Sequence, residues 1–381
     1  MRFFHFYFCL AVLFLYACQS TTNKQVERKE TSAKLVVKTE HFQLHQELDG
    51  YRLKVMTPFV GSEQKETYWL SNTAKVEKSQ DATHHVQIPV QKVAINSTTH
   101  LGYLAELDRV STIKGASNLD LAFDQEFQQR VESGEIADLG KQHFDQELLV
   151  ATNPDVLFAY AIGADDFQRL EDYRRLGQKV VLIAEYMESD PLEKAKWLIA
   201  LAAFYGKSEV NKALAKYQAI EKRYDSLQQL ASKAKKQPTV LLSLPWKGTW
   251  YMGGGNSFQA RFLADANANY LWKDDSSKAS LPLAIETVFE RGISADFWLN
   301  PSALSSKSRM LETDERFKSF EAFKNDRIFN ISKRVNEAGG NDYWESAVVK
   351  PDVILADLIQ IFHPNLMPQE RELYYYKKLD P

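Results

Sequence analysis

The stretch that decides the fold covers residues 190–236 and reads DPLEKAKWLIALAAFYGKSEVNKALAKYQAIEKRYDSLQQLASKAKK. It opens with a strong helix start, because Asp190 can cap the helix, Pro191 fits its first turn and Glu193 can bond back to the cap. Gly206 is a residue type typical of helix C-termini, so the first helix is expected to end there.

A second, longer helix is predicted to begin at Ser208. Apolar side chains recur along it at helical spacing, and residues 233–236 form a basic last turn that suits a helix C-terminus. These apolar side chains are Val210, Leu214, Tyr217, Ile220, Tyr224, Leu227 and Ala231. At 1.5 Å per residue, roughly 26 residues span about 40 Å, which is long enough to join two lobes. The alternative is a peripheral helix on a single large domain.

Short apolar strands alternate with helices on both sides of this stretch. The strands are predicted at residues 93–96, 156–158 and 179–183 before it, and at residues 240–244, 296–299 and 327–330 after it. Continuous β-branched runs between helices favour parallel sheets that are buried on both faces. The sequence therefore predicts an α/β fold in which two Rossmann-like lobes with parallel-rich sheets are joined by one long α-helix.

The segment before the first lobe has a different pattern. Apolar residues alternate on both sides of Asp49 and Gly50, a dipeptide typical of β-hairpins, and residues 67–70 can add a third strand. We therefore expect a small N-terminal β extension. The predicted organisation is a signal peptide in residues 1–17, a flexible tether in 18–37, the β extension in 38–87, the N-terminal lobe in 88–190, a helical segment in 191–237 and the C-terminal lobe in 238–381.

The N-terminus resembles a bacterial lipoprotein signal. Arg2 precedes an apolar run over residues 3–15, and the small Ala17 stands directly before Cys18, whose thiol can carry diacylglycerol. We expect a membrane-anchored lipoprotein on the periplasmic or cell-surface side. The alternative is an ordinary cleaved signal peptide with an incidental cysteine.

Composition excludes several classes of protein. The net charge is −3 and both signs are interspersed, which leaves no basic face for nucleic acid. Cys9 lies in the part that would be removed, so the mature chain cannot form an internal disulfide, and no Cys/His zinc pattern is present. We expect a monomer without a cofactor or a resident metal.

Taken together, these features resemble the Fe/B12 type of periplasmic binding protein in lipoprotein form. Members of this family are the solute-binding proteins of ABC transporters, and a long, stiff helix joins their two lobes. The resemblance covers about residues 90–364. It rests on the order and spacing of residues 93–110, 147–156, 206–217, 256–270 and 352–362.

The resemblance implies a function and a set of partners. The chain would capture an iron complex, siderophore or haem, in a cleft between the lobes, with cobalamin as the alternative ligand. It would then deliver the ligand to an ABC permease and ATPase complex while lipid on Cys18 holds it at the membrane. In this family each lobe presents a surface carboxylate to permease arginines, and the matching positions are Glu147 and Glu286. Both can also be ordinary solvated helix residues.

The ligand site is expected where loops follow the carboxyl ends of the strands. Two tryptophans and a tyrosine within residues 246–251 suit a large flat ligand. Arg334 can neutralise an anionic chelate or pair internally, and His100 alone does not make a metal site. The candidate ligand-binding residues are Thr99, His100, Tyr160, Tyr186, Trp246, Trp250, Tyr251, Asn256, Arg334, Asn341, Tyr343 and Trp344.

Enzyme signatures are not found in the sequence. It contains no GxSxG or HExxH motif and no cysteine nucleophile, so we expect a binding protein and not an enzyme. Two other functions remain open. One is a lipid-anchored glycoside hydrolase that pairs carboxylates such as Glu185 and Asp342. The other is a surface lipoprotein that binds proteins through the β extension and exposed aromatic residues.

Overall fold

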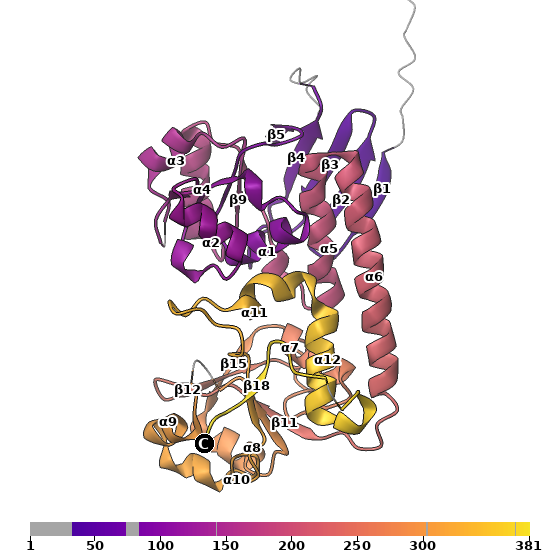
Figure 1. Ribbon diagram of the computed structural model, residues 1–381, viewed down its shortest axis with the longest axis vertical. Coiled ribbons are helices and arrows are strands. Elements are labelled where there is room, and N and C mark those ends of the chain that lie inside the picture. The colour runs from indigo at the N-terminus through magenta and orange to yellow at the C-terminus, as the bar shows by residue number, and fades with distance from the viewer. Residues whose placement is uncertain (1–32, 74–83, 142, 302–303, 370) are drawn as a thin grey trace, which may run out of the picture. The chain divides into compact units, whose positions relative to one another are not determined.

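Helix α6 (Lys207–Ala231) is the long helix that the sequence predicted after Gly206. In the computed structural model it runs beside α5 (Pro191–Ala202) and α12 (Pro351–Phe362), as Figure 1 shows. Asp190 caps α5 as predicted, accepting backbone hydrogen bonds 2.8 and 3.3 Å long.

Helix α6 contributes side chains to two separate hydrophobic cores. Val210 and Tyr217 belong to the core of the first half of the chain, and Tyr224 and Ala231 to that of the second half. The helix therefore connects two independently packed bodies, so the prediction of a joining helix is confirmed, and it is not a peripheral helix on one domain.

The end of α6 differs from the prediction. The helix stops at Ala231, before the basic residues 233–236 that were expected to form its last turn. Asn267 supplies the reason, because its amide donates to the carbonyl oxygens of Ala231 and Ala234 at 3.1 and 3.2 Å and satisfies them outside a helix. Pro238 further disfavours helical backbone just before it.

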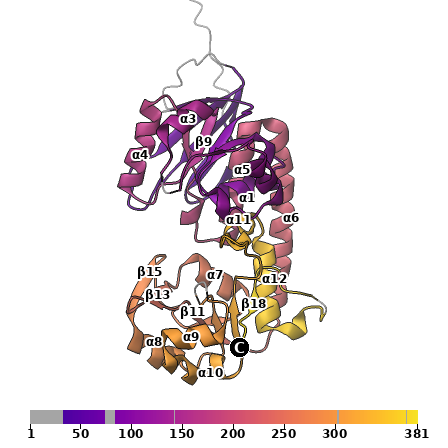
Figure 2. The same ribbon diagram turned by 60° about the vertical axis from the view of Figure 1, so that its left-hand side comes forward.

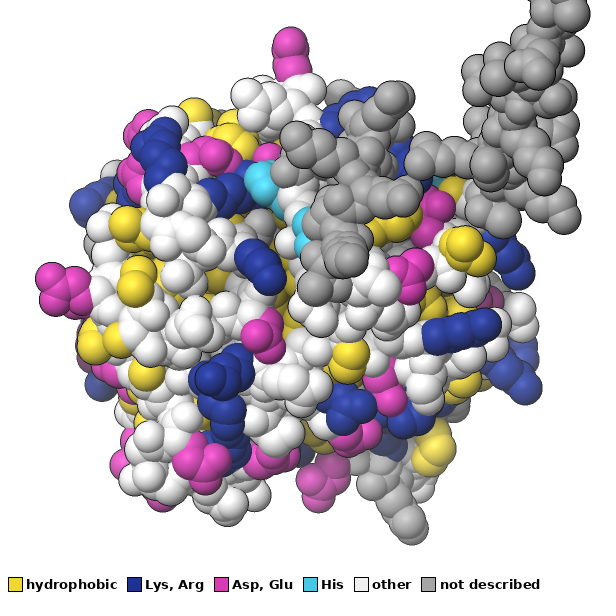
Figure 3. Space-filling model, turned by 90° about the horizontal axis from the view of Figure 1, so that it is seen from above, with side chains coloured by type: hydrophobic (Ala, Val, Ile, Leu, Met, Phe, Trp, Pro, Cys, Tyr) yellow, Lys and Arg dark blue, Asp and Glu magenta, His cyan; other side chains and the backbone are white. Residues whose placement is uncertain are grey.

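The structure describes residues 33–73, 84–141, 143–301, 304–369 and 371–381, which belong to one compact unit, residues 33–381. The predicted signal peptide, Cys18 and residues 18–32 of the tether lie outside the described residues. Within the described part of the chain, no helix is both long and apolar enough to cross a membrane. Figure 3 shows positive and negative side chains interspersed over the face that it presents.

The N-terminal sheet confirms the predicted β extension. Its strand order is β1-β2-β3-β4-β5, with the β2–β3 hairpin turning at Leu48 and Asp49, directly before Gly50 at the start of β3. The strands are β1 (Lys34–Lys38), β2 (Phe42–Glu47), β3 (Gly50–Val55), β4 (Glu66–Ser71) and β5 (His84–Gln87). Residues 34–37, assigned to the tether by the sequence, are part of β1, because Val36 and Val37 pack against the first core.

The second sheet is fully parallel and has the order β10-β9-β6-β7-β8. Its strands are β6 (Val93–Ile95), β7 (Ile113–Ala116), β8 (Ala137–Asp138), β9 (Val156–Ala159) and β10 (Val180–Leu182). We name the body around this sheet the N-terminal lobe. In sequence order the strands run outward from β6 on one side and then from β9 on the other, so the topological switch point lies between β6 and β9.

The third sheet has the order β14-β11-β16-β17-β18 and is parallel except for β18. Its strands are β11 (Thr239–Leu242), β14 (Asn269–Tyr270), β16 (Phe297–Leu299), β17 (Ile328–Asn330) and β18 (Lys377–Lys378). We name the body around it the C-terminal lobe, and its switch point lies between β11 and β16. In both views helices α8–α10 lie on the side of this sheet away from α6 (Figures 1 and 2).

A small antiparallel sheet replaces the aromatic loop that the sequence predicted at residues 246–251. It consists of β12 (Pro245–Trp246), β13 (Thr249–Gly253) and β15 (Ser280–Ala284), in the order β12-β13-β15. Strand β13 pairs along its whole length with β15, whose residues come about thirty positions later in the chain. Pairing with a distant partner is the reason that a local loop signal failed here.

The remaining helices are short. The α-helices are α1 (Thr98–Glu106), α2 (Gln125–Glu132), α3 (Gln146–Thr152), α4 (Ala164–Arg175), α7 (Phe258–Asp265), α8 (Ile285–Gly292), α9 (Lys307–Thr313), α10 (Glu321–Lys324) and α11 (Asp342–Glu345). The 3-10 helices are η1 (Val110–Thr112), η2 (Leu119–Leu121), η3 (Glu185–Met187), η4 (Ala203–Tyr205), η5 (Glu315–Ser319), η6 (Ser346–Val349) and η7 (Pro364–Leu366).

Candidate functional site

The first part of the candidate site is a cavity of about 350 Å³ in the N-terminal lobe, which we name the N-lobe pocket. It lies at the switch point, because Asn96 follows β6 and Tyr160 follows β9, and the Tyr160 amide donates to Asn96 Oδ1 at 3.1 Å. The pocket is lined by Asn96, Ser117, Asn118, Lys141, His143, Phe144, Tyr160, Ile162, Asp166, Arg169, Leu170 and Tyr173.

The charge of the N-lobe pocket is positive. Its lining carries two cationic side chains, Lys141 and Arg169, against one carboxylate, Asp166. Asp166 forms an ion pair with Arg169 across one turn of α4 and also accepts the Ile162 amide at 3.0 Å, so the guanidinium is held in place. Lys141 is 75% exposed and forms an ion pair with Asp120 at 3.3 Å, so an anion in the pocket would compete with Asp120 for this ammonium group.

Tyr160, which lines this pocket, lies beside Tyr186. The Tyr186 hydroxyl donates to the Ala161 carbonyl at 2.7 Å, and the Tyr160 and Tyr186 rings lie 6.3 Å apart. Burial, assisted by the Glu185 carboxylate, raises the pKa of Tyr186 to about 12, and burial also raises the pKa of Tyr160. Both phenols therefore stay protonated and able to donate hydrogen bonds. The sequence predicted both residues, and the structure brings them together.

The second part is the interlobe pocket, a cavity of about 320 Å³ with walls from both lobes. Ser243, which follows β11 at the second switch point, lines it. The N-terminal lobe contributes Tyr186, Met187, Glu188 and Ser189, and the C-terminal lobe contributes Ser243, Tyr251, Gly253, Ser257, Phe258, Gln259, Lys278, Ala279 and Ser280. Because Tyr186 lines this pocket and lies beside Tyr160, the two pockets adjoin.

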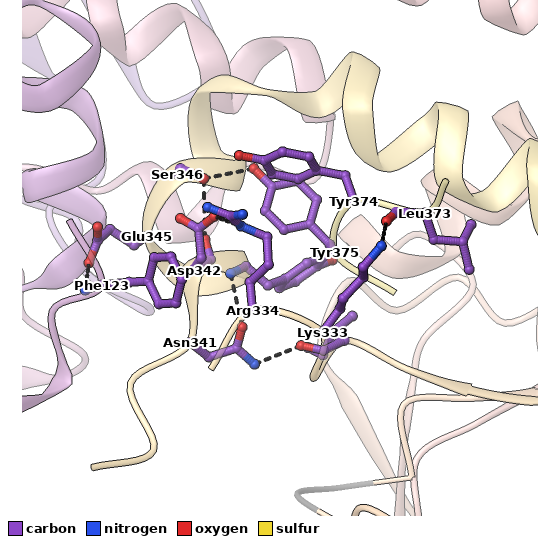
Figure 4. A network of polar contacts seen from close by, with 12 residues as sticks. Phe123, Lys333, Arg334, Asn341, Asp342, Glu345, Ser346, Leu373, Tyr374 and Tyr375 are labelled. Carbon is purple, nitrogen blue, oxygen red and sulfur yellow. Dashed lines mark hydrogen bonds and ion pairs between the residues drawn. The ribbon is translucent and has the colours of Figure 1, made fainter. Parts of the chain in front are cut away.

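A third region, which we name the lobe joint, consists of residues 119–124 of the N-terminal lobe and 334–346 of the C-terminal lobe. Figure 4 shows Arg334 within it. Its Nε lies 2.5 Å from Asp342 Oδ2, and its guanidinium lies over the rings of Phe123 and Tyr374. Arg334 therefore interacts with protein groups. This is the arrangement expected from the alternative in which Arg334 forms an internal ion pair.

Two backbone-directed contacts hold the lobe joint together. Glu345 Oε2 accepts a hydrogen bond from the Phe123 backbone amide at 2.7 Å. The Asn336 side-chain amide donates to the backbone carbonyls of Asp120 and Ala122 at 3.0 and 2.9 Å. These bonds link the two lobes directly. Glu345 and Asn336, which are not among the predicted ligand residues, thus hold one lobe against the other beside the predicted ligand residue Arg334.

Three predicted ligand residues lie in the protein core. Trp250 is fully buried, its indole donates to the Leu242 carbonyl at 3.0 Å, and Tyr343 is 6% exposed in the second core. His100 is also fully buried, and burial lowers its pKa to about 3, so the ring is neutral. All three side chains face the core from strand or helix positions, and none of them lines the N-lobe pocket.

Other predicted residues take mixed positions. Trp246 and Tyr251 are exposed with ring centres 6.4 Å apart, and Trp344 is also exposed. Of these, Tyr251 lines the interlobe pocket. Three remaining residues bond to the protein: Thr99 donates to Glu185 at 2.6 Å, Asn256 to the Ser276 carbonyl at 2.9 Å and Asn341 to the Ile331 carbonyl at 2.8 Å.

Several lining residues were missed from the sequence. The main ones are Lys141, His143, Arg169, Glu188 and Lys278. Lys141 and His143 follow β8, a strand of two residues that leaves no periodic signal in the sequence. The three others lie on helix or loop positions where a charged residue is usually solvated. Only the order of the strands in each sheet could have indicated that these residues line the pockets.

The predicted docking carboxylates are both exposed. Glu147 lies in the first turn of α3, and Glu286 lies in the first turn of α8 with 79% of its side chain exposed. Arg316 approaches Glu286 at 4.0 Å. Each lobe thus presents one of the two carboxylates on its surface, although docking itself stays a prediction. Among the described residues, no group of three or more His, Cys, Asp or Glu side chains is placed to hold a metal ion.

The comparisons with known proteins begin with a family model. The model described as periplasmic binding protein matches residues 97–335. Two uncharacterized lipoproteins of Methanocaldococcus jannaschii are similar along most of the chain. One is 27% identical over 311 residues, covering 79% of this chain and 72% of its own, and the other is 24% identical over 377 residues, covering 95% and 92%.

Solved structures share the fold. A possible iron-binding (periplasmic solute-binding) protein from Staphylococcus epidermidis has a TM-score of 0.57 at 18% identity, over 72% of this chain and 99% of its own. A periplasmic binding protein from Veillonella parvula has 0.57 at 13%, over 80% and 96%. The triscatecholate siderophore binding protein from Bacillus subtilis, complexed with ferri-bacillibactin, has 0.54 at 18%, over 72% and 94%.

Proposed function

Because the chain belongs to the periplasmic binding protein family, we propose that it is the substrate-binding component of an ABC importer. In this proposal it captures an iron complex, siderophore or haem, between its lobes and delivers it to a permease and ATPase complex. Its relatives in Methanocaldococcus jannaschii are named lipoproteins, which supports an extracytoplasmic protein held at the membrane through lipid on Cys18. We expect it to act as a monomer.

The observation that carries this proposal is the N-lobe pocket at the β6/β9 switch point. Lys141 and Arg169 suit an anionic metal chelate, since guanidinium and ammonium groups form charge-assisted hydrogen bonds to carboxylate or catecholate oxygens. Tyr160 and Tyr186 add flat, hydrogen-bonding faces beside these cations. Arg334, the residue from which the sequence argued for an anionic ligand, lies in the lobe joint, so Lys141 and Arg169 now carry that argument.

The ligand class can be tested with a panel of ferric siderophores, haemin and cobalamin. Purified protein is expected to show quenching of tryptophan fluorescence with an anionic iron complex at micromolar or tighter affinity. Replacing Lys141 and Arg169 together with glutamine should weaken that binding about 10- to 100-fold, since each lost charge-assisted bond costs a few kcal/mol at most.

The matched control is Lys235→Gln, which removes one exposed positive charge outside both pockets and should leave the affinity unchanged. Cobalamin binding that is insensitive to the double substitution would instead favour the alternative ligand. No response to any member of the panel would refute the proposed function. A protein partner recovered by pull-down, without a small ligand, would favour the protein-binding alternative.

The glycoside hydrolase alternative loses its basis in this structure. It required Glu185 and Asp342 to face one another across a shared cavity. Glu185 is buried and bonded by Thr99, whereas Asp342 pairs with Arg334 in the lobe joint. The two carboxyl groups are thus engaged in different parts of the protein, and we retain the binding function.

A further inference from the structure

The turn between β1 and β2 reaches both lobes beside the interlobe pocket. The Thr39 hydroxyl donates to Glu188 Oε1 at 2.5 Å, and Lys278 Nζ donates to both carboxylate oxygens of Glu40, at 2.8 and 2.6 Å. Glu188 and Lys278 both line that pocket. The turn belongs to the N-terminal sheet, which lies before the residues that the family model matches. This sheet is therefore positioned to shape the site.

Glu188 is the group on which this turn acts. It is 1% exposed, and its Oε1 also accepts the Trp197 indole N–H at 3.0 Å. Its buried Oε2 accepts no hydrogen bond from an N–H or O–H group of the described residues, but the Glu193 carboxyl lies close enough to share a proton with Glu188. When both carboxyls are ionised that oxygen has no partner, which is costly, so the pocket-lining Glu188 carboxylate is then suited to a ligand group that donates a hydrogen bond.

The surroundings of Glu188 are acidic. Burial is the main cause that raises its pKa to about 7, the Thr39 and Trp197 bonds oppose it, and the nearby Glu193 carboxyl raises it further. Glu185 lies in the same region, and Lys194 is attracted to both Glu185 and Glu188. These three carboxyl groups and the single ammonium group of Lys194 thus give the region a net negative charge when the carboxyl groups are ionised.

The other charged groups near the pocket do not offset this balance. Lys278 is paired with Glu40, and burial lowers the pKa of His41, which favours its neutral form. Lys194, already counted above, lies with its Nζ 4.3 Å from the centre of the Phe258 ring. The interlobe pocket therefore differs from the N-lobe pocket, whose lining is positive. If the two adjoining pockets form one site, they favour a ligand with a negatively charged part for the N-lobe pocket and a positively charged part for the interlobe pocket.

We propose that the interlobe pocket is a subsite for an ammonium group carried on an arm of the metal chelate, with Glu188 as its acceptor and Thr39 as a positioning residue. This inference rests on the proposed function and deepens it by naming the class of ligand. The metal-bound, oxygen-rich part lies against Lys141 and Arg169, and the amine arm extends past Tyr186 to Glu188. Strand β1 and its turn thereby become part of the binding site.

The test compares two chelates that differ only at the arm. The first is a ferric trihydroxamate that ends in a primary amine, and the second is the same chelate with its amine acetylated. If the protein binds only catecholate siderophores, the test compares a ferric tris-catecholate that ends in a primary amine with its acetylated form. Calorimetric titration at pH 8, where Glu188 is ionised, should give at least about tenfold tighter binding of the amine form. At pH 6 the advantage should shrink, because Glu188 then holds a proton.

Substitutions at Glu188 and Thr39 distinguish a role in ligand binding from a purely structural role. Glu188→Gln should make the two chelates bind within about twofold of each other, and Thr39→Val should do the same, whereas Thr39→Ser keeps the hydroxyl and should retain the preference. Glu132→Gln, which removes an exposed carboxylate at the end of α2, is the control and should behave as wild type.

Each outcome decides one claim. Equal affinity of the wild-type protein for the two chelates overturns the subsite and leaves the proposed function intact, as does binding of haemin alone, which carries no amine arm. Binding of cobalamin alone overturns the subsite and favours the alternative ligand. An equal loss for both chelates in Glu188→Gln would mean that Glu188 is structural. If no iron complex or cobalamin binds at all, the proposed function fails and the subsite with it.

Discussion

Glu345 is the residue through which the lobe joint responds to pH. It is 3% exposed in the C-terminal lobe, and its Oε2 accepts a backbone hydrogen bond from Phe123 in the other lobe. Burial is the main cause that raises its pKa to about 7, with Asp342 and Asp124 adding to the rise and the Phe123 and Asp124 amides opposing it. The native protein therefore keeps a proton on Glu345 that the unfolded chain loses near its ordinary value of 4.5.

The stability that this proton contributes is fully present below pH 4.5 and is lost as the pH rises to about 7. We predict that Glu345→Gln, which keeps the acceptor oxygen but cannot ionise, loses this dependence. Between pH 5 and pH 8 the free energy of unfolding of the wild type should fall by about 1–3 kcal/mol relative to the variant. Urea unfolding at the two pH values measures this, and parallel profiles would contradict it.

At the scale of elements, the close approach of α1 to the segment containing α11 and η6 joins the lobes. Gly102 makes this approach possible, since a Cβ there would lie 2.0 Å from the Glu345 carbonyl oxygen. That contact is with backbone, so it cannot be relieved by a side-chain rotation. The glycine is required for space and not for an unusual backbone conformation.

We predict that Gly102→Ala lowers the free energy of unfolding by about 1–3 kcal/mol, because it forces the lobe joint apart. Gly163→Ala is the matched control, since a Cβ at Gly163 would have no neighbour within 4 Å. It should change stability by no more than about 0.5 kcal/mol. Thermal unfolding of the two variants provides the measurement, and equal midpoints would show that the joint tolerates the added methyl group.

At the scale of the whole molecule, the proposed transport function requires the loaded protein to meet a permease. Glu147 and Glu286 lie on α3 of one lobe and α8 of the other, and both are exposed. Two charges fixed on separate rigid bodies can set the register of docking and speed association, more than they raise affinity. In our proposal ligand capture, by contrast, uses the pockets at the switch points.

We predict that replacing Glu147 and Glu286 together with alanine leaves ligand affinity unchanged and abolishes uptake of labelled iron complex by cells that carry the transporter. Glu132→Gln serves again as the control and should support uptake. Loss of ligand binding in the double variant would contradict the docking assignment. Normal uptake would show that both carboxylates are ordinary surface residues.

Much of the fold follows from patterns between neighbours in the chain. The Asp190 cap, the 3.6-residue periodicity after Gly206 and the Asp49-Gly50 hairpin each lie within a few residues, and each is observed. Glu147 and Glu286, the residues predicted to dock, are exposed on helices α3 and α8, and their docking role stays a prediction. Local signals of this kind were sufficient for the two lobes and the helix that joins them.

The sequence by itself thus determined the α/β class, the joining helix and the small β extension, because caps, turns and periodicity depend on residues close in the chain. Tertiary structure alone decided which side chains line the two pockets. Pairing of β13 with β15 buried Trp250, and the order of parallel strands brought Lys141, Tyr160 and Arg169 to one edge. Contacts between distant segments are set by packing of the whole chain, which no local pattern contains.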